Sequence, residues 1–197
     1  MNRWAAVAAI YASVGLIFGG VATYLRGAAF TYPEPWIELS PVLAHLYSLL
    51  LGLTLGLMAV AATLLLVRRT VWAKTLHEEL RPLATGLPTS GVIALAVFSA
   101  LGEEMLFRSV LQPATNLWIQ ALVFGLAHQL PGKARFTWAL WATIMGLLFG
   151  ALFQATGSLL GPIVAHATIN GMNLRFLQSH KSSPPVRAMG GILGQRI

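Results

Sequence analysis

Long runs of apolar residues, separated by short polar connections, dominate the pattern along this chain. A helix needs about 20 residues to cross the hydrocarbon core of a membrane. Six segments are long enough to do so, and they cover residues 4–25, 41–67, 89–112, 113–130, 136–155 and 157–177. The pattern therefore predicts an all-α fold, a polytopic membrane helical bundle of about six transmembrane helices.

The composition agrees with a chain that lies in lipid. Hydrophobic residues make up 56% of the 197 positions, charged residues only 10%, and the mean hydropathy is +0.71. A soluble domain carries about 25% charged residues. No internal repeat and no soluble domain can be recognised in the sequence. We therefore expect one integral membrane domain over residues 1–197.

Basic residues in the connections between the apolar segments predict the orientation. Eleven of them lie on the same predicted side of the membrane. Arg3 precedes the first segment, and the other ten lie on alternate connections or near the C-terminus: Arg68, Arg69, Lys74, Arg81, Lys133, Arg135, Arg175, Lys181, Arg187 and Arg196. The opposite side keeps Arg26. The positive-inside rule then places both termini in the cytoplasm. Because the charges lie at the ends of spans and form no single patch, the net charge of +7 predicts no nucleic-acid partner.

Two stretches lie outside the apolar segments. Residues 68–88 mix charges with apolar residues at helical spacing, which predicts a helix along the cytoplasmic interface. Glu78 and Glu79 in this stretch are interpreted as part of a solvated face. Residues 178–197, with two serines followed by two prolines, predict a disordered tail.

Three charged residues interrupt the third apolar segment. Glu103, Glu104 and Arg108 lie within it, and a charged side chain at the centre of a spanning helix costs about 2.5–3.5 kcal/mol. Positions four apart share one face of a helix, so Glu104 and Arg108 can form an ion pair. Glu103 then has no cation of its own, which suits a general base. The alternative is a structural polar cluster that joins helices.

Two later segments each carry polar groups at a similar depth. His128 follows Phe124 by four residues, and His166 precedes Asn170 by four. At about 1.5 Å per residue, Glu103, His128, His166 and Asn170 fall within a layer of about 8 Å near the midplane. Taken singly, His128 could be an interfacial residue, and the other pair a hydrogen bond between helices. Together, two carboxylates, two imidazoles and one amide predict chemistry inside the membrane.

The missing residue types narrow that chemistry. The chain contains no cysteine, and all six of its acidic residues are glutamates. Thiol nucleophiles, disulfides and cysteine metal sites are therefore excluded. The absence of aspartate excludes aspartyl proteolysis and a Ser-His-Asp triad. A proton-coupled carrier could use buried carboxylates, but the sequence lacks inverted repeats and paired broken helices.

Three ordered motifs resemble those of a known family. Glu-Glu-x-x-x-Arg at 103–108, Phe-x-x-x-His at 124–128 and His-x-x-x-Asn at 166–170 are similar to the motifs of the CAAX-protease and bacteriocin-processing family of intramembrane endopeptidases. Each motif is weak alone, whereas the ordered set is specific. The resemblance covers roughly residues 90–175, which we take as the catalytic core.

The resemblance implies a conical helical bundle and a role for each motif residue. Glu103 and His128 would activate a water molecule, and His166 and Asn170 would form an oxyanion hole. Glu104 and Arg108 would support them. The family resemblance also leaves room for one divalent metal, most simply zinc, with Glu103, His128 and His166 as candidate ligands. We favour a mechanism that requires no cofactor.

The resemblance further implies partners and a location. Substrates in the family are membrane-associated proteins or peptides, cut in or near a C-terminal or leader segment, so lipid and such a peptide are the expected partners. The extra helices of the eukaryotic prenyl-protein enzymes are not found in this sequence, which favours a bacterial inner membrane. A non-catalytic scaffold or immunity-type protein that uses the same polar cluster for structure is the alternative.

Overall fold

Helices account for nearly all of the described chain. The computed structural model describes residues 2–129 and 131–181. Their elements are, in order, α1 (Arg3–Arg26), α2 (Pro41–Arg69), α3 (Val71–Ala84), α4 (Thr89–Glu104), the π-helix η1 (Met105–Leu111), α5 (Gln112–Ala114), α6 (Leu117–Ala127), α7 (Arg135–Thr156) and α8 (Leu160–Ser179). In this part of the chain the only β-type pairing is one isolated bridge between Thr31 and Ser158. The predicted all-α class is confirmed.

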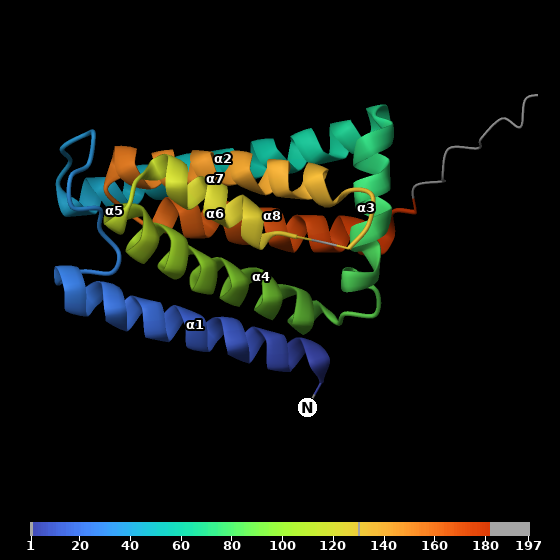
Figure 1. Ribbon diagram of the computed structural model, residues 1–197, viewed down its shortest axis with the longest axis horizontal. Helices are drawn as coiled ribbons and strands as arrows, with labels where there is room; N and C mark the ends of the chain where they lie inside the picture. The colour runs from blue at the N-terminus through green and yellow to red at the C-terminus, as the bar shows by residue number, and fades with distance from the viewer. Residues whose placement is uncertain (1, 130, 182–197) are drawn as a thin grey trace, which may run out of the picture.

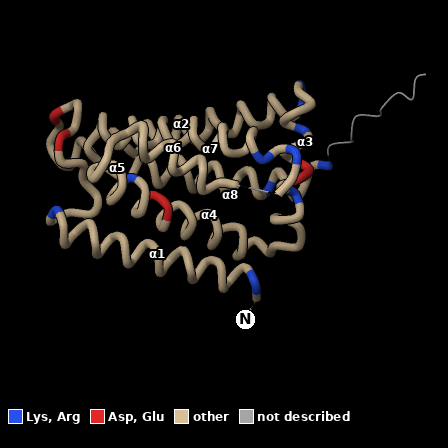
Figure 2. Tube along the Cα trace, in the orientation of Figure 1, with Lys and Arg blue, Asp and Glu red and all other residues tan. Residues whose placement is uncertain are grey.

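The long helices run side by side, and one helix crosses their ends (Figure 1). Helix α4 packs between α1 and α8, α2 packs on α8, and α6 packs on α7. Helix α3 lies across one end of the bundle and contacts α2, α7 and α8. Most basic positions gather at this end, together with acidic positions on α3, and further acidic positions lie on α4 and in the connection between α1 and α2 (Figure 2). Among the described residues, the buried side chains of Glu, Lys and Arg are those of Glu104 and Arg108.

In the described part of the chain, four helices are long and apolar enough to cross a membrane: α1, α2, α7 and the continuous run Thr89–Ala114. The chain is therefore an integral membrane protein. Helix α8 has 20 residues but carries His166 and Asn170, and it is not among these four. The predicted total of about six spans stays a prediction.

Helix α6 is shorter than the segment predicted at 113–130. It has 11 residues, which rise about 16 Å, against a hydrocarbon core of about 30 Å. The side chain of Asn116 starts the helix by accepting hydrogen bonds from the backbone N–H groups of Trp118 and Ile119, both at 2.9 Å. The helix ends before His128, whose backbone leaves the helical conformation (φ −91°, ψ 54°). Helix α6 alone therefore cannot cross the membrane.

The predicted interfacial segment forms α3, but one of its glutamates is not simply solvated. The carboxylate of Glu79 accepts hydrogen bonds from the backbone N–H groups of Lys133 at 3.0 Å and Ala134 at 3.1 Å. These residues immediately precede α7. The interpretation of Glu79 as part of a solvated face is therefore wrong, because this side chain fastens α3 to the connection that follows His128.

The C-terminal part of the chain is described as far as residue 181. Helix α8 continues through Ser179, so the first two residues of the predicted disordered tail are helical. The rest of that prediction, from residue 182 to 197, lies outside the described residues.

Glycines allow α2 and α8 to touch backbone to backbone. A Cβ atom added at Gly52 would collide with the backbone of Gly161, so the two helices would have to separate. Gly52→Ala is expected to lower the free energy of unfolding by about 1–3 kcal/mol, which is typical of overpacking. Unfolding by SDS in mixed micelles, followed by tryptophan fluorescence, measures the change. Gly20→Ala is the control, since a Cβ there meets nothing within 4 Å; an equal loss in both variants would contradict the packing explanation.

Candidate active site

The carboxylate of Glu103 lies at the last turn of α4, immediately before the π-helix η1. Its Oε2 atom is 3.5 Å from Nε2 of His128 and 3.8 Å from Nε2 of His166. The Glu103 side chain is 13% exposed, and its Oε2 has no hydrogen-bond partner among the described residues. One oxygen of Glu103 therefore faces two imidazoles that come from two other helices.

A backbone hydrogen bond sets the orientation of His128. Its Nδ1 is 2.7 Å from the carbonyl oxygen of Phe124, one turn earlier. A carbonyl oxygen can only accept, so Nδ1 carries a proton and the neutral ring has an unprotonated Nε2. The ring also packs on Phe124, with centroids 4.4 Å apart, and Phe124 packs edge-on against Phe107. His128 thus presents a proton acceptor toward Glu103.

His166 is held from the other side by the second glutamate. Its Nδ1 is 2.7 Å from Oε1 of Glu104, and its ring is stacked on Phe149 with centroids 5.4 Å apart. Because Nδ1 is engaged with Glu104, Nε2 is the atom turned toward Glu103. The two adjacent glutamates therefore contact opposite nitrogens of one imidazole.

Asn170 lies one turn after His166 on α8 and faces the same side. Its Nδ2 donates a hydrogen bond to Oγ of Ser99 at 2.9 Å. Ser99 precedes Glu103 by four residues, so both side chains lie on one face of α4. Ser99 and Glu103 on α4 have the same spacing as His166 and Asn170 on α8. The two polar faces therefore meet, with Ser99 against Asn170 and Glu103 against His166.

The predicted ion pair is present and fully buried. Nη1 of Arg108 is 3.2 Å from Oε1 of Glu104, and neither side chain is exposed. Nη2 of Arg108 donates to the backbone carbonyl of Gly146 on α7 at 3.4 Å. The guanidinium lies 4.2 Å from the ring centroid of Phe124 on α6. Arg108 therefore joins η1 to α6 and α7 while it neutralises Glu104.

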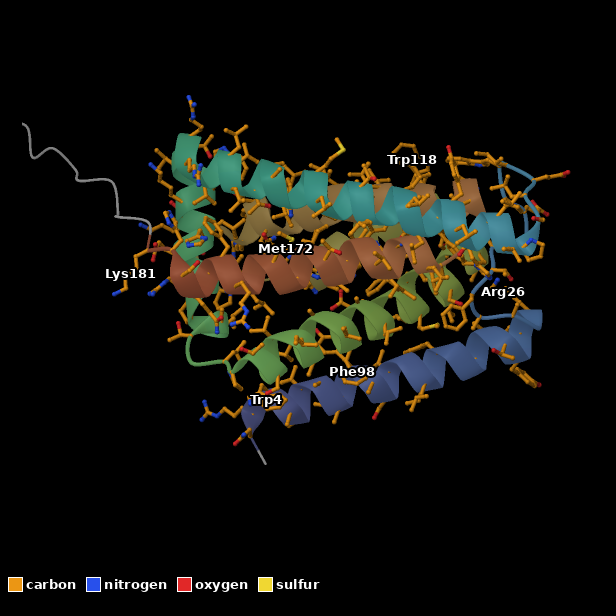
Figure 3. The ribbon with its side chains drawn as sticks, turned by 180° about the vertical axis from the view of Figure 1, so that it is seen from behind. Trp4, Arg26, Phe98, Trp118, Met172 and Lys181 are labelled. Carbon is orange, nitrogen blue, oxygen red and sulfur yellow. The ribbon has the colours of Figure 1, made fainter. Side chains whose placement is uncertain are left out.

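Glu103, His128, His166 and Asn170 all line one cavity of about 750 Å³. Most of its other lining residues are apolar, among them Trp138, Trp141 and Leu174. The cavity also reaches Arg3 and Trp4, and Figure 3 shows Trp4 at the same end of the bundle as Lys181, opposite Arg26. It thus extends from the polar group inside the bundle to the end where the basic residues gather, and it can hold an apolar chain.

Two residues of this site were missed by the sequence analysis. Ser99 could have been found, because its spacing of four from Glu103 repeats that of His166 and Asn170. Tyr11 lines the same cavity as Glu103, and its ring lies beside Gly102, the residue before Glu103. Nothing in the sequence around Tyr11 distinguishes it from an ordinary aromatic residue of an apolar span.

The donor atoms at the site are of a kind that zinc accepts, because zinc binds imidazole nitrogens and carboxylate oxygens. Nδ1 of His128 contacts the carbonyl oxygen of Phe124, and Nδ1 of His166 contacts the carboxylate of Glu104. Zinc-bound histidines have partners of the same kind at the ring nitrogen that does not bind the metal. However, within residues 2–129 and 131–181 no group of three or more His, Cys, Asp or Glu side chains is arranged to hold a metal ion. The mechanism proposed below uses these side chains without a metal ion.

Comparison with known proteins places the site within a family. Residues 85–172 match the model of the type II CAAX prenyl endopeptidase Rce1-like family. The chain is also 35% identical over 83 residues to the uncharacterized protein YpbD of Bacillus subtilis (strain 168), a match that covers 41% of this chain and 42% of that relative. No solved structure matches the chain. The three motifs, which form one site in the fold, all lie within the residues that match this family model, so the resemblance predicted from the motifs is confirmed.

Proposed function

We propose that this protein is an intramembrane endopeptidase that hydrolyses a peptide bond in or near a membrane-associated C-terminal or leader segment. One observation carries the proposal: Nε2 of His128 and Nε2 of His166 both lie within 3.8 Å of Oε2 of Glu103, at the wall of an apolar cavity. A carboxylate beside two imidazoles suits general acid–base work on water. The apolar walls suit a hydrophobic peptide segment.

Glu103 acts as the general base and His128 as its partner. Glu103 takes a proton from a water molecule as the water oxygen attacks the carbonyl carbon of the substrate. The unprotonated Nε2 of His128, 3.5 Å from Glu103, orients this water and shares the proton. When the tetrahedral intermediate collapses, the C–N bond breaks and the proton passes to the leaving nitrogen. The products are a carboxylic acid and an amine, and the acid then passes its proton to the amine to give a carboxylate and an ammonium group, so atoms and charges balance.

His166 and Asn170 stabilise the oxyanion of the intermediate. The amide of Asn170 has a second N–H group besides the one bound to Ser99, and this group is available to an oxyanion. His166 donates at Nε2 only when both of its ring nitrogens carry protons, since Nδ1 is engaged with Glu104. The Glu104 carboxylate, 2.7 Å from Nδ1, balances the charge of such a ring. Loss of one oxyanion donor typically costs about 10²–10³-fold in kcat.

The proposal extends to location and substrate access. The end of the bundle crossed by α3 carries most basic positions (Figure 2), which by the positive-inside rule faces the cytoplasm of a bacterial inner membrane. The cavity reaches the same end, through Arg3 and Trp4. Substrate and water therefore reach Glu103 from the cytoplasmic side. An apolar C-terminal tail fits these walls, and nucleic acid does not.

The test of the proposal is cleavage of a library of peptides with apolar C-terminal tails by the purified protein in lipid nanodiscs. The reaction is run in water enriched in ¹⁸O, with the Glu103→Gln variant as the blank. We expect two products from each cleaved peptide, with one ¹⁸O atom in the new carboxylate, because water supplies that oxygen. No cleavage above the blank by a folded protein would contradict the proposal and favour a structural scaffold.

Removal of metal is expected to leave this activity unchanged. The proposed steps use Glu103, His128, His166 and Asn170 without a metal ion. Treatment with 1,10-phenanthroline and EDTA, followed by removal of the chelators, should change the cleavage rate by less than about twofold, whereas displacement of a catalytic zinc would abolish it. Full recovery of a lost rate on addition of zinc would overturn the metal-free mechanism.

A further inference from the structure

Helix α1 contributes one wall of the catalytic cavity although it lies far from the motifs in sequence. Figure 1 shows α1 along the flank of the bundle, against α4. Trp4, Val7 and Tyr11 all line the cavity. Their spacings of three and four place them on one face of the helix. The family match begins at residue 85, so it does not include this wall.

A close approach of two helices brings this wall to the catalytic glutamate. A Cβ atom added at Gly102 would lie 2.6 Å from the backbone oxygen of Tyr11 and 3.3 Å from its ring. A Cβ added at Gly15 would lie 3.6 Å from Cα of Gly102. Only a glycine at 102 permits this contact without displacing α1. Tyr11 is therefore packed directly beside the residue that precedes Glu103.

The depth of Tyr11 argues against a role as a membrane-surface anchor. Interfacial tyrosines lie near the ends of spanning helices, with the ring at the level of the lipid headgroups. Tyr11 follows the start of α1 by eight residues, which places it about 12 Å along the helix. At this depth the surrounding lipid offers a phenol hydroxyl no hydrogen-bond partner, so the polar groups of the cavity are the partners available to it.

A suitable partner within the protein is the Glu103 carboxylate. Tyr11 and Glu103 line the same cavity, and the Tyr11 ring lies beside Gly102, the residue before Glu103. Glu103 Oε2 is buried without a hydrogen-bond partner among the described residues. A phenol is a neutral donor, so it can hold a carboxylate in place without forming the ion pair that would weaken a base. Glu103 would then differ from Glu104 in its partner, since Glu104 forms an ion pair with the Arg108 guanidinium.

We propose that Tyr11 is a positioning residue, whose hydroxyl donates to Glu103 and holds the carboxylate toward His128 and the cavity. The proposal rests on the proposed peptidase function, in which Glu103 activates water. It makes α1, which carries none of the motifs, a necessary part of the active site. Tyr11 acts through Glu103 and does not itself touch the substrate carbonyl.

The experiment compares Tyr11→Phe with the wild type on a single fluorogenic peptide, chosen from the tail library as the one that the wild type cleaves fastest. Phenylalanine keeps the ring that packs on Gly102 and removes only the hydroxyl. We expect kcat to fall about tenfold, as the loss of one hydrogen bond in the transition state predicts, while KM changes less than about twofold. The midpoint of thermal unfolding should stay the same.

Tyr24→Phe is the matched control, because Tyr24 lies on the same helix and is 89% exposed. It should leave kcat, KM and the unfolding midpoint unchanged. A kcat for Tyr11→Phe equal to that of Tyr24→Phe would overturn the positioning role while the peptidase function stands. A loss of kcat accompanied by a lower unfolding midpoint would also overturn it, in favour of a structural role. If the wild type and Glu103→Gln cleave the peptide at the same rate, both the proposed function and this inference are wrong.

Discussion

Glu103→Gln is expected to reduce kcat for cleavage of the tail peptides by at least about 10²–10⁴-fold, the usual contribution of a general base. Glutamine keeps the size of the side chain and one carbonyl oxygen, but it cannot take a proton from water. Since Glu103 is 13% exposed and is not the partner of Arg108, the change should leave folding intact. Initial rates in nanodiscs, measured with product analysis by mass spectrometry, give the effect.

Glu38→Gln is the control for this first prediction, because Glu38 lies exposed in the connection between α1 and α2. It should cleave at the wild-type rate. If Glu103→Gln retains more than about a tenth of the wild-type kcat, the assignment of Glu103 as the base is wrong. In that case His128 or an unassigned group must activate the water.

Arg108→Leu is expected to lower the free energy of unfolding by about 3–5 kcal/mol, because it leaves the buried carboxylate of Glu104 without its cation. Both side chains are fully buried, and Arg108 also contacts the carbonyl of Gly146 and the ring of Phe124. Leucine replaces none of these interactions. SDS titration in mixed micelles, followed by tryptophan fluorescence, measures the loss.

Two variants make the second prediction specific to the buried charge. Arg68→Leu removes an exposed arginine at the end of α2 and should change the free energy of unfolding by less than about 1 kcal/mol. Glu104→Gln combined with Arg108→Leu removes both charges, and it should be more stable than Arg108→Leu alone. A double variant that is less stable than the single one would show that packing of the guanidinium, and not its charge, dominates.

The long helices could be predicted from the sequence because their cause is local. Helices α1, α2 and α7 begin and end within two residues of the predicted bounds. A helix that faces lipid must satisfy its own backbone hydrogen bonds and carry about 20 apolar residues, and both requirements can be counted along the chain. Helix α6 departs from its prediction because Asn116 and His128 end it through side-chain and backbone contacts that hydropathy does not register.

The motif residues could also be grouped from the sequence, since a spacing of four fixes a common face. Glu104 with Arg108, Phe124 with His128, and His166 with Asn170 each meet this condition. The structure brings the last two pairs to one cavity, and Glu104 of the first pair contacts His166 behind it. The similar depth of these residues in the membrane could be predicted from the bounds of the spans. The distances between their side chains could not be predicted, because a shared depth does not determine which faces of three helices meet.

Contacts between helices were decided by the tertiary structure alone. The π-helix η1 directly after Glu104, the bond between Asn170 and Ser99, and the contact of Glu79 with the N-terminus of α7 have no signature in a local pattern. Tyr11 lies beside Gly102 because glycine at that position lets α1 approach α4. The sequence by itself determined which segments are helices and which faces are polar, since both follow from neighbours along the chain. Which faces touch depends on close packing between distant residues, and therefore only the folded bundle determined the complete candidate site.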